Sequence, residues 1–357
     1  MRVSREAWNL KEESFGPLLP YVQDEDITDI NFNGTDVWVE HLKRGIYKAP
    51  VKLSKEFVNQ LSIRVSNVVS EQINKYNNVL EAETDILRIS IIHPSATNTG
   101  YAVSIRKTPA VMRLTEEKML REKYCSSEVL EFLISCIHAR MNIVFCGRPG
   151  AGKTELLKFL TQYIPKEEKV MTIEDTLEIH YKDINPGANC VELKVDDEFF
   201  PYTKAIKTAL RQNPQWVLLS EARSVEVKYL LECFSTGLHG LTTLHTDDTR
   251  KIPDRIQNMM QDAYAASRLE NDIYSFLNVG VLLRKKVTEA KEVVRFIDQI
   301  CLFDRVEEQN IKHLLVEGGE FVSKEIPRNI QKKFHMGNKQ IPPLNKKQAD
   351  EGAWRRV

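Results

Sequence analysis

Apolar and polar positions alternate along several short runs in the first 110 residues, as they do in half-buried β-strands. Asn33-Gly34, between the first two runs, is a strong signal for a hairpin turn. Ser54 can cap a helix that reaches about Ser70, and a short amphipathic helix is predicted over 8–23. The predicted strands cover 27–32, 37–39, 45–47, 86–92 and 101–106. Residues 1–110 are therefore predicted to form a smaller N-terminal α+β domain.

From about residue 128 the pattern changes to apolar strands that alternate with amphipathic helices. A helix is predicted over about 128–139. Strands are then predicted over 142–146, 169–173, 216–219, 241–244, 278–283 and 293–297. Helices are predicted between them over 203–211 and 225–234. Such alternation is typical of a largely parallel sheet covered by helices. The fold class predicted for residues 128–325 is therefore α/β.

Two segments fall outside these domains. Residues 111–127 are predicted to be a linker, in which Thr115 starts a short helix. After about Ile326 the chain carries Pro, Lys, Asn and Gln and ends in Trp354-Arg355-Arg356-Val357, which predicts a basic, mobile tail over 326–357. A solvated tail without a task and a docking peptide both fit this composition.

The strand predicted over 142–146 leads into a glycine-rich loop with the spacing G-x-x-x-x-G-K-[ST], and a helical pattern follows it. This is the phosphate-binding P-loop, in which glycines let backbone N–H groups surround an anion at a helix N-terminus. A chance glycine turn is the alternative, and the strand before and helix after disfavour it. The predicted nucleotide-binding residues are Gly147, Arg148, Pro149, Gly150, Ala151, Gly152, Lys153 and Thr154.

Within this loop, Lys153 is predicted to reach the β- and γ-phosphates, and the Thr154 hydroxyl to ligate Mg²⁺. The predicted cofactors are thus ATP and Mg²⁺. Hydrolysis also requires a group that polarises water and groups that neutralise the charge on the leaving phosphate.

Two acids follow later strands, at the edge where parallel sheets carry their ligands. Glu174 ends the strand 169–173 and is the candidate for orienting or deprotonating water, with a helix-capping acid as the alternative. Glu221 follows the apolar run 216–219 in the manner of a Walker B acid, but Ser220 stands where an Asp is usual. Glu221 is therefore predicted to support Mg²⁺ through its water ligands.

Histidines and arginines are candidates for contacts with the γ-phosphate. His239 and His245 flank the strand over 241–244, and at least one is predicted to sense the γ-phosphate. Arg88 and Arg106 lie on two strands of the N-terminal domain and would act as arginine fingers if that domain met the nucleotide. Ordinary exposed strand arginines are the alternative.

Composition narrows the class of protein. The chain has 357 residues, which suggests two or three domains, and its 50 Lys and Arg balance 50 Asp and Glu. That balance gives a nucleic-acid-binding track little support. We expect no signal peptide and no membrane-spanning run. Six scattered cysteines predict buried thiols in a reducing cytosol rather than disulfides or zinc ligands.

Taken together and in order, these clusters resemble the secretion-ATPase superfamily: the VirB11-type type IV secretion ATPases, the CpaF/TadA-type pilus assembly ATPases and, more distantly, the type II secretion and pilus motors. The resemblance spans roughly residues 25–300. In the N-terminal domain it rests on Asp29-Ile30-x-Phe32-Asn33-Gly34, Arg88-Ile89-Ser90 and Ser104-Ile105-Arg106-Lys107. Beyond the P-loop it rests on Thr172-Ile173-Glu174-Asp175-Thr176, Ser220-Glu221-Ala222-Arg223 and Thr243-Leu244-His245.

The resemblance and the P-loop together imply that residues 128–325 form a RecA-like P-loop NTPase core. The resemblance also implies a ring of six subunits with nucleotide between the two domains, and it raises the case for Arg88 and Arg106 as phosphate contacts. The Thr236-Gly237-Leu238-His239 run departs from the family's Thr-Gly-His, which leaves His239 in doubt more than His245. The cysteine pairs of zinc-bearing type II ATPases are missing, which argues against that branch.

The predicted function is Mg²⁺-dependent ATP hydrolysis by a hexameric motor of a type IV secretion, conjugation or Flp-type pilus machine. Its expected partners are copies of itself and inner-membrane platform proteins, and its expected location is the cytoplasmic face of the cell membrane. Two alternatives stay open: a DNA translocase or helicase on the same core, and a nucleotide-gated scaffold that scarcely hydrolyses ATP.

Overall fold

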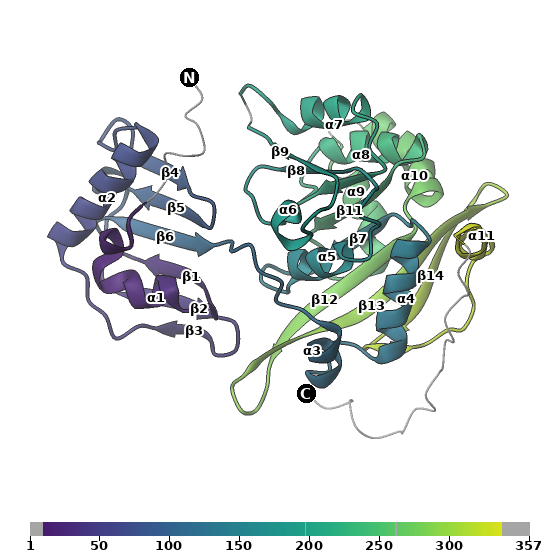
Figure 1. Ribbon diagram of the computed structural model, residues 1–357, viewed down its shortest axis with the longest axis horizontal. Coiled ribbons are helices and arrows are strands. Elements are labelled where there is room, and N and C mark those ends of the chain that lie inside the picture. The colour runs from purple at the N-terminus through teal and green to yellow at the C-terminus, as the bar shows by residue number, and fades with distance from the viewer. Residues whose placement is uncertain (1–9, 197, 261–262, 338–357) are drawn as a thin grey trace. The chain divides into compact units, whose positions relative to one another are not determined.

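The computed structural model describes residues 10–337, apart from 197 and 261–262 (Figure 1). Its contacts divide the chain into two compact units. The first consists of residues 1–110 with the short segments 176–178 and 287–294, and the second of residues 111–175, 179–286 and 295–357.

The first unit contains a six-stranded antiparallel sheet in the order β3-β2-β1-β6-β5-β4. Its strands are β1 (Ile27–Phe32), β2 (Val37–His41), β3 (Gly45–Lys48), β4 (Val79–Glu83), β5 (Leu87–Ile92) and β6 (Ala102–Lys107). Its helices are η2 (Glu12–Leu18), α1 (Leu19–Gln23), α2 (Lys55–Val69) and η3 (Pro94–Ala96). The strand predictions for this unit are confirmed, and β4 was missed.

Alternation of side chains gives this sheet one buried face. Along β5, Leu87, Ile89 and Ile91 are buried while the residues between them are partly exposed. The α2 side chains Val58 and Leu61 pack into the same cluster. The helix starts where the sequence predicts, because the Ser54 hydroxyl accepts a hydrogen bond from the Phe57 N–H group at 3.1 Å.

The second unit contains a nine-stranded sheet in the order β15-β14-β13-β12-β7-β11-β10-β8-β9. The strands from β12 to β9 in this order pair in parallel, whereas β13, β14 and β15 pair antiparallel. The strands are β7 (Ile143–Cys146), β8 (Val170–Glu174), β9 (Cys190–Lys194), β10 (Trp216–Leu219), β11 (His239–Leu244), β12 (Val279–Val287), β13 (Val293–Val306), β14 (Gln309–Glu317) and β15 (Glu320–Phe321).

Helices cover both faces of this sheet, as the α/β prediction requires (Figure 1). Phe145 and Leu218 face a core shared with α4, α5 and α11, whereas Val144 and Leu219 face a core shared with α7, α8, α9 and α10. The helices are α3 (Glu116–Arg121), α4 (Ser127–His138), α5 (Lys153–Thr161), α6 (Tyr181–Ile184), α7 (Tyr202–Leu210), α8 (Glu226–Ser235), η4 (Thr249–Lys251), α9 (Ile252–Gln257), α10 (Ala263–Phe276) and α11 (Arg328–Met336).

The prediction of a mobile tail from 326 onward is wrong for its first part. Residues 328–336 form helix α11, and Ile330 and Phe334 are buried in the core. Phe334 packs 6.0 Å from the Phe132 ring of α4, measured between ring centroids. The basic composition hid this helix because only its buried stripe is apolar. The remaining residues, 338–357, lie outside the described ones.

Two general expectations can be compared with the structure. All six cysteines are free thiols, of which five are buried and Cys190 is partly buried. Among the described residues, no helix has the length and apolar character needed to cross a bilayer.

One buried residue, Asn142, ties together three strands of the sheet. Asn142 immediately precedes β7, and its amide oxygen accepts from the Gly240 N–H of β11 at 3.0 Å while its amide nitrogen donates to the Phe276 carbonyl at 2.7 Å. Its backbone N–H donates to the side chain of Asn278, which precedes β12, at 3.0 Å. The side chain and the backbone N–H of Asn142 together therefore fix the relative height at which β7, β11 and β12 begin.

Replacing Asn142 by alanine is expected to lower the free energy of unfolding by about 2–6 kcal/mol. The change leaves one buried donor and one buried acceptor without their partner, at about 1–3 kcal/mol each. Chemical denaturation measures the loss, with the exposed Asn258→Ala as the matched control. Equal stability of the two variants would show that this amide does not hold the strands.

Candidate functional site

The P-loop has the geometry of an anion cradle. Gly147 has φ +145°, and a Cβ there would lie 2.4 Å from the Leu283 carbonyl oxygen, so only glycine fits. Gly152, with φ +93°, precedes α5 and offers no side chain to cap the helix. The first turn of α5 thus presents its N–H groups and positive dipole end to an incoming anion. These residues fit a nucleotide phosphate.

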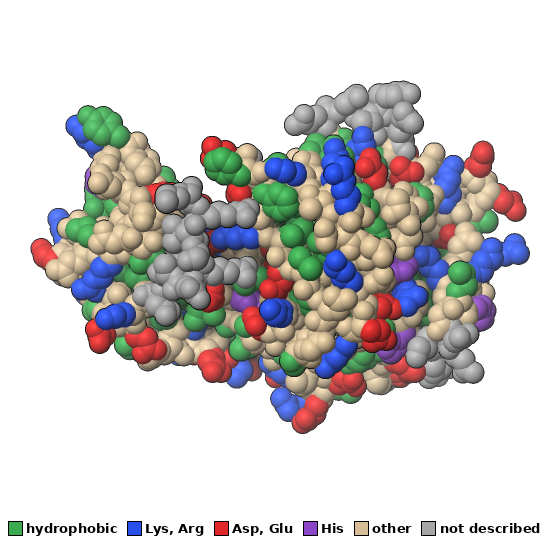
Figure 2. Space-filling model, turned by 45° about the horizontal axis from the view of Figure 1, so that its top comes forward, with side chains coloured by type: hydrophobic (Ala, Val, Ile, Leu, Met, Phe, Trp, Pro, Cys, Tyr) green, Lys and Arg blue, Asp and Glu red, His purple; other side chains and the backbone are tan. Residues whose placement is uncertain are grey.

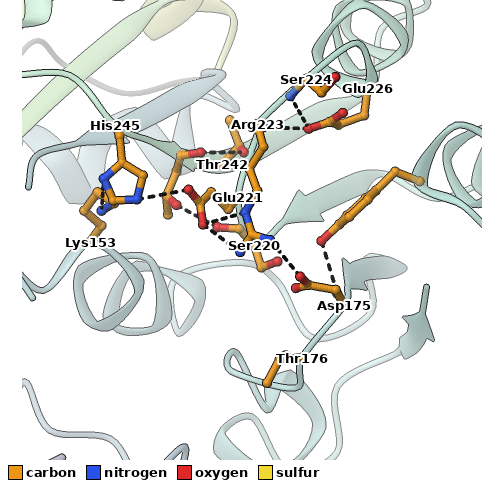
Figure 3. A network of polar contacts seen from close by, with 12 residues as sticks. Lys153, Asp175, Thr176, Ser220, Glu221, Arg223, Ser224, Glu226, Thr242 and His245 are labelled. Atoms are coloured by element: carbon orange, nitrogen blue, oxygen red, sulfur yellow. Dashed lines mark hydrogen bonds and ion pairs between the residues drawn. The ribbon is translucent and has the colours of Figure 1, made fainter. Parts of the chain in front are cut away.

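Polar side chains form a chain that starts at the P-loop (Figure 3). The Lys153 ammonium donates to the Gly147 carbonyl at 3.2 Å and lies 3.4 Å from the His245 Nδ1 atom. His245 directly follows β11, and its Nε2 lies 3.0 Å from Glu221 Oε1, at the end of β10. The structure therefore brings together Lys153, Glu221 and His245, three residues that the sequence placed at neighbouring strand ends.

The protonation state of His245 determines the direction of the hydrogen bonds between Lys153, His245 and Glu221. Burial, followed by the charge of Lys153, lowers the pKa of the imidazole below its usual range, so the ring is neutral at pH 7. A neutral ring has one N–H. With the proton on Nε2, the ring donates to Glu221 and Nδ1 can accept from Lys153; with the proton on Nδ1, the ring donates instead to the Gly147 carbonyl, which lies 3.1 Å away. His245 therefore lies in contact with both the P-loop and the Glu221 carboxylate.

Arg223 extends this series of polar contacts on the other side of Glu221 (Figure 3). Its Nε and Nη2 atoms lie 2.9 Å from Glu221 Oε2, and its Nη1 atom lies 2.9 Å from Asp175 Oδ2 at the end of β8. Burial opposes the positive charge of Arg223, but the hydrogen bond to Glu221 and the two negative charges outweigh it and raise the pKa of the guanidinium.

Glu174 is not part of the series of contacts from Lys153 to Asp175. Its side chain is 2 % exposed, and Oε2 accepts the Ile179 backbone N–H at 3.0 Å. The carboxylate thus holds the loop after β8 in place. Contact with an attacking water is the role predicted for this residue, and the bond to Ile179 engages Oε2 of the carboxylate, not Oε1.

His239 lies at the opposite end of β11 from His245, roughly 20 Å away at the usual rise of a strand. Its ring packs against Trp216, with ring centroids 5.4 Å apart. A γ-phosphate contact is therefore out of reach for His239, and only His245 keeps the predicted sensing role.

The two arginines of the first unit face each other across β5 and β6. Arg88 is the antiparallel neighbour of Arg106, and acids continue this row on both sides, with Asp29 next to Arg106 and Glu83 next to Arg88. Arg106 Nε donates to Asp29 Oδ1 at 2.9 Å, and Arg88 lies 3.8 Å from Glu81. The acids offset the repulsion that two facing cations bring to a sheet.

Two arginines near the P-loop were missed or given no role at the sequence level. Arg295 of β13 donates from Nε to the Gly150 carbonyl at 2.9 Å and so braces the loop. No local signal marks Arg295, because its position depends on how β13 joins the sheet. Arg223 was visible two residues after Glu221, but its contact with Asp175 depends on the order of the strands.

The fit for Mg²⁺ depends on few protein ligands. Thr154 lies in the first turn of α5, and the Glu221 carboxylate lies beyond His245. Among the described residues, no group of three or more His, Cys, Asp or Glu side chains could hold a metal by itself. Mg²⁺ at phosphate sites usually keeps several waters and takes one or two protein oxygens, so Thr154 and Glu221 suit that arrangement.

The parallel sheet, the P-loop after β7 and the acids at neighbouring strand ends define a P-loop protein with an additional N-terminal β domain. The chain belongs to the type II/IV secretion system protein family, whose model matches residues 23–326. This assigns the chain to the superfamily that its motifs resemble.

Relatives and solved structures agree with this family. VirB11, a type IV secretion system protein of Brucella suis, is 27 % identical over 277 residues, which cover 68 % of this chain and 76 % of that protein. An uncharacterised Bacillus anthracis protein is 28 % identical over 324 residues, covering 87 % and 70 %.

The fold is that of solved secretion and pilus ATPases. The Legionella pneumophila ATPase DotB has a TM-score of 0.57 at 18 % identity, covering 80 % of this chain and 79 % of its own. The pilus retraction motor PilT, solved with bound ADP, has a TM-score of 0.54 at 17 % identity, covering 87 % and 82 %.

The half-buried His239 predicts a pH effect on stability. Burial, followed by the charges of Lys333 and Arg140, lowers the pKa of His239 to about 4, against about 6.5 in an unfolded chain. Between these values the unfolded chain binds more protons, so stability is complete above about pH 6.5 and falls as the pH drops toward 4. His239→Gln is expected to flatten this slope in denaturation curves from pH 7 to 4.5. The exposed His335→Gln is the control, and a wild-type slope in His239→Gln would contradict the assignment.

Proposed function

We propose that this chain is a Mg²⁺-dependent ATPase that powers a type IV secretion, conjugation or Flp-type pilus assembly machine. The observation that carries the proposal is the continuous contact from the P-loop lysine through His245 to Glu221. A phosphate that draws Lys153 toward itself changes the partner of His245, and through it the position of Glu221. Binding at the P-loop thus reaches the acid that acts in hydrolysis.

Within this proposal each residue has a defined task. Lys153 and the N-terminus of α5 hold the phosphates, and Thr154 and Glu221 hold Mg²⁺, the latter through water. The bound metal would neutralise charge that develops on the phosphate oxygens. His245 senses the γ-phosphate, while Glu174 orients the attacking water, with Oε2 held by the Ile179 N–H group.

Arg88 and Arg106 are proposed to stabilise charge on the transferred phosphate from the N-terminal domain. Both already lie beside acids, so this task requires them to exchange Glu81 and Asp29 for phosphate oxygens. That exchange keeps the arginines ordered without leaving a bare cation on the sheet.

The assembly and location are part of the proposal. The ring of six copies, working with inner-membrane platform proteins at the cytoplasmic face of the membrane, is what the resemblance to the secretion-ATPase superfamily implies, and the family match and the relative named VirB11 support that class of protein. In such a ring, closing and opening of the two domains around ATP would drive the machine.

A DNA translocase on the same core is the first alternative. Such a protein needs a basic or aromatic track for the strand. On the face shown in Figure 2, cationic and anionic side chains are interspersed, without a large continuous area of either sign. Stimulation of turnover by DNA would favour this alternative.

Lys153→Ala is expected to lower ATP turnover by at least about 100-fold, since it removes a preorganised cation from the developing phosphate charge. Lys228→Ala, an exposed lysine on α8, is the matched control and should hydrolyse ATP like the wild type. Steady-state phosphate release measures both. Turnover of Lys153→Ala at the wild-type rate would overturn the proposed site.

Turnover per subunit is expected to rise with protein concentration as rings form. The measurement is phosphate release across a concentration series, with particle mass determined on the same samples with and without Mg·ATP. A wild type that binds ATP but hydrolyses none at any concentration would favour the second alternative, a nucleotide-gated scaffold.

A further inference from the structure

Arg223 joins two acids that come from different strands of the sheet. Glu221 follows β10 and Asp175 follows β8, and these strands are parallel neighbours. Arg223 Nε donates to Oε2 of Glu221 and Nη1 donates to Oδ2 of Asp175, both at 2.9 Å, and Nη2 forms an ion pair with the same Glu221 oxygen at 2.9 Å (Figure 3). The planar guanidinium suits this task, because its donors point in fixed directions.

The backbone under Arg223 is itself held in place. The buried Glu226 carboxylate, in the first turn of α8, accepts the N–H groups of Arg223 and Ser224 at 2.5 and 2.7 Å. Asp175 is also fixed, because its N–H donates to the Tyr202 hydroxyl at 3.1 Å. The bridge therefore runs between two anchored points rather than between two mobile surface side chains.

This bridge determines which oxygen of Glu221 faces the P-loop. Arg223 occupies Oε2, and Oε1 points to His245 Nε2 at 3.0 Å. Without Arg223 the carboxylate can rotate about its last bond, and Asp175 then repels it. On the P-loop side, the charged and titratable groups are Lys153 and His245. Of these two, His245 contacts Oε1, and Lys153 contacts His245.

We propose that Arg223 is a positioning residue for ATP hydrolysis: by bridging Glu221 and Asp175 it holds the Glu221 carboxylate in the orientation that the proposed reaction requires. The inference rests on the proposed ATPase function. Arg223 acts through Glu221 and not on the nucleotide, so its loss slows the chemical step and leaves nucleotide binding intact.

A purely stabilising role would give a different result. The Arg223 side chain is 52 % exposed, and ion pairs with exposed partners add little to stability. We therefore expect Arg223→Gln to melt within about 3 °C of the wild type. A slow but fully folded variant separates positioning from support of the fold.

The test compares kcat, KM and the affinity for a fluorescent ATP analogue in the full chain with Mg²⁺. For Arg223→Gln we expect kcat to fall by about 10- to 100-fold, as when a residue that orients a ligand is lost. KM and analogue affinity should stay within about threefold. Arg223→Lys should lie between the two, because lysine keeps the charge but loses the fixed donor directions.

The bridge is tested by chemical rescue and by a double variant. Millimolar guanidinium should raise the turnover of Arg223→Ala, since it can occupy the same pair of carboxylates. Asp175→Asn should also lower kcat, and the combination with Arg223→Gln should be no slower than Arg223→Gln alone. Effects of the two changes that multiply would overturn the bridge.

Arg121→Gln is the matched control. Arg121 also lies between two carboxylates, 3.3 Å from Glu117 and 3.8 Å from Glu122, but on helix α3. Its turnover should equal that of the wild type. Wild-type kcat in Arg223→Gln, or loss of analogue binding together with kcat, would overturn the inference. An inactive wild type would instead overturn the proposed function itself.

Discussion

The candidate site depends on the parallel register of four neighbouring strands. β7, β11, β10 and β8 run in the same direction with residue-by-residue pairing, so the residues after them meet at one edge of the sheet. Gly147, His245, Glu221 and Asp175 each occupy the first or second position after their strand. A slip of one strand would move its side chain out of reach of the others, and Asn142 opposes such a slip at the opposite edge.

Much of this edge could be predicted because its signals are local. The P-loop spacing and the apolar runs before Glu221 and His245 mark strand ends without any knowledge of the fold. The residue that comes after a strand is visible in the sequence, but the side chains it contacts are not. The bond from Glu174 to the Ile179 backbone and the bridge from Arg223 to Asp175 both depend on the path of loops and on strand order.

Composition was a misleading guide where a short buried stripe lies among charges. Helix α11 carries two buried side chains, Ile330 and Phe334, within a basic stretch that looks like a solvated tail. Strand β9 (Cys190–Lys194) was missed for a related reason: as the last strand of the sheet it is half exposed and lacks a long apolar run. Tertiary packing decides both elements.

The charges at the site limit where phosphate charge can be compensated. Arg223 directs its three contacts to Glu221 and Asp175, and two acids balance the pair of cations formed by Arg223 and Lys153. Arg223 therefore adds no net attraction for phosphate. In the proposed reaction the remaining attraction would come from the α5 N-terminus and a bound Mg²⁺, which together would offset only part of the charge of ATP. The proposed phosphoryl transfer would then call for further cations, and this is the physical argument for the proposed roles of Arg88 and Arg106.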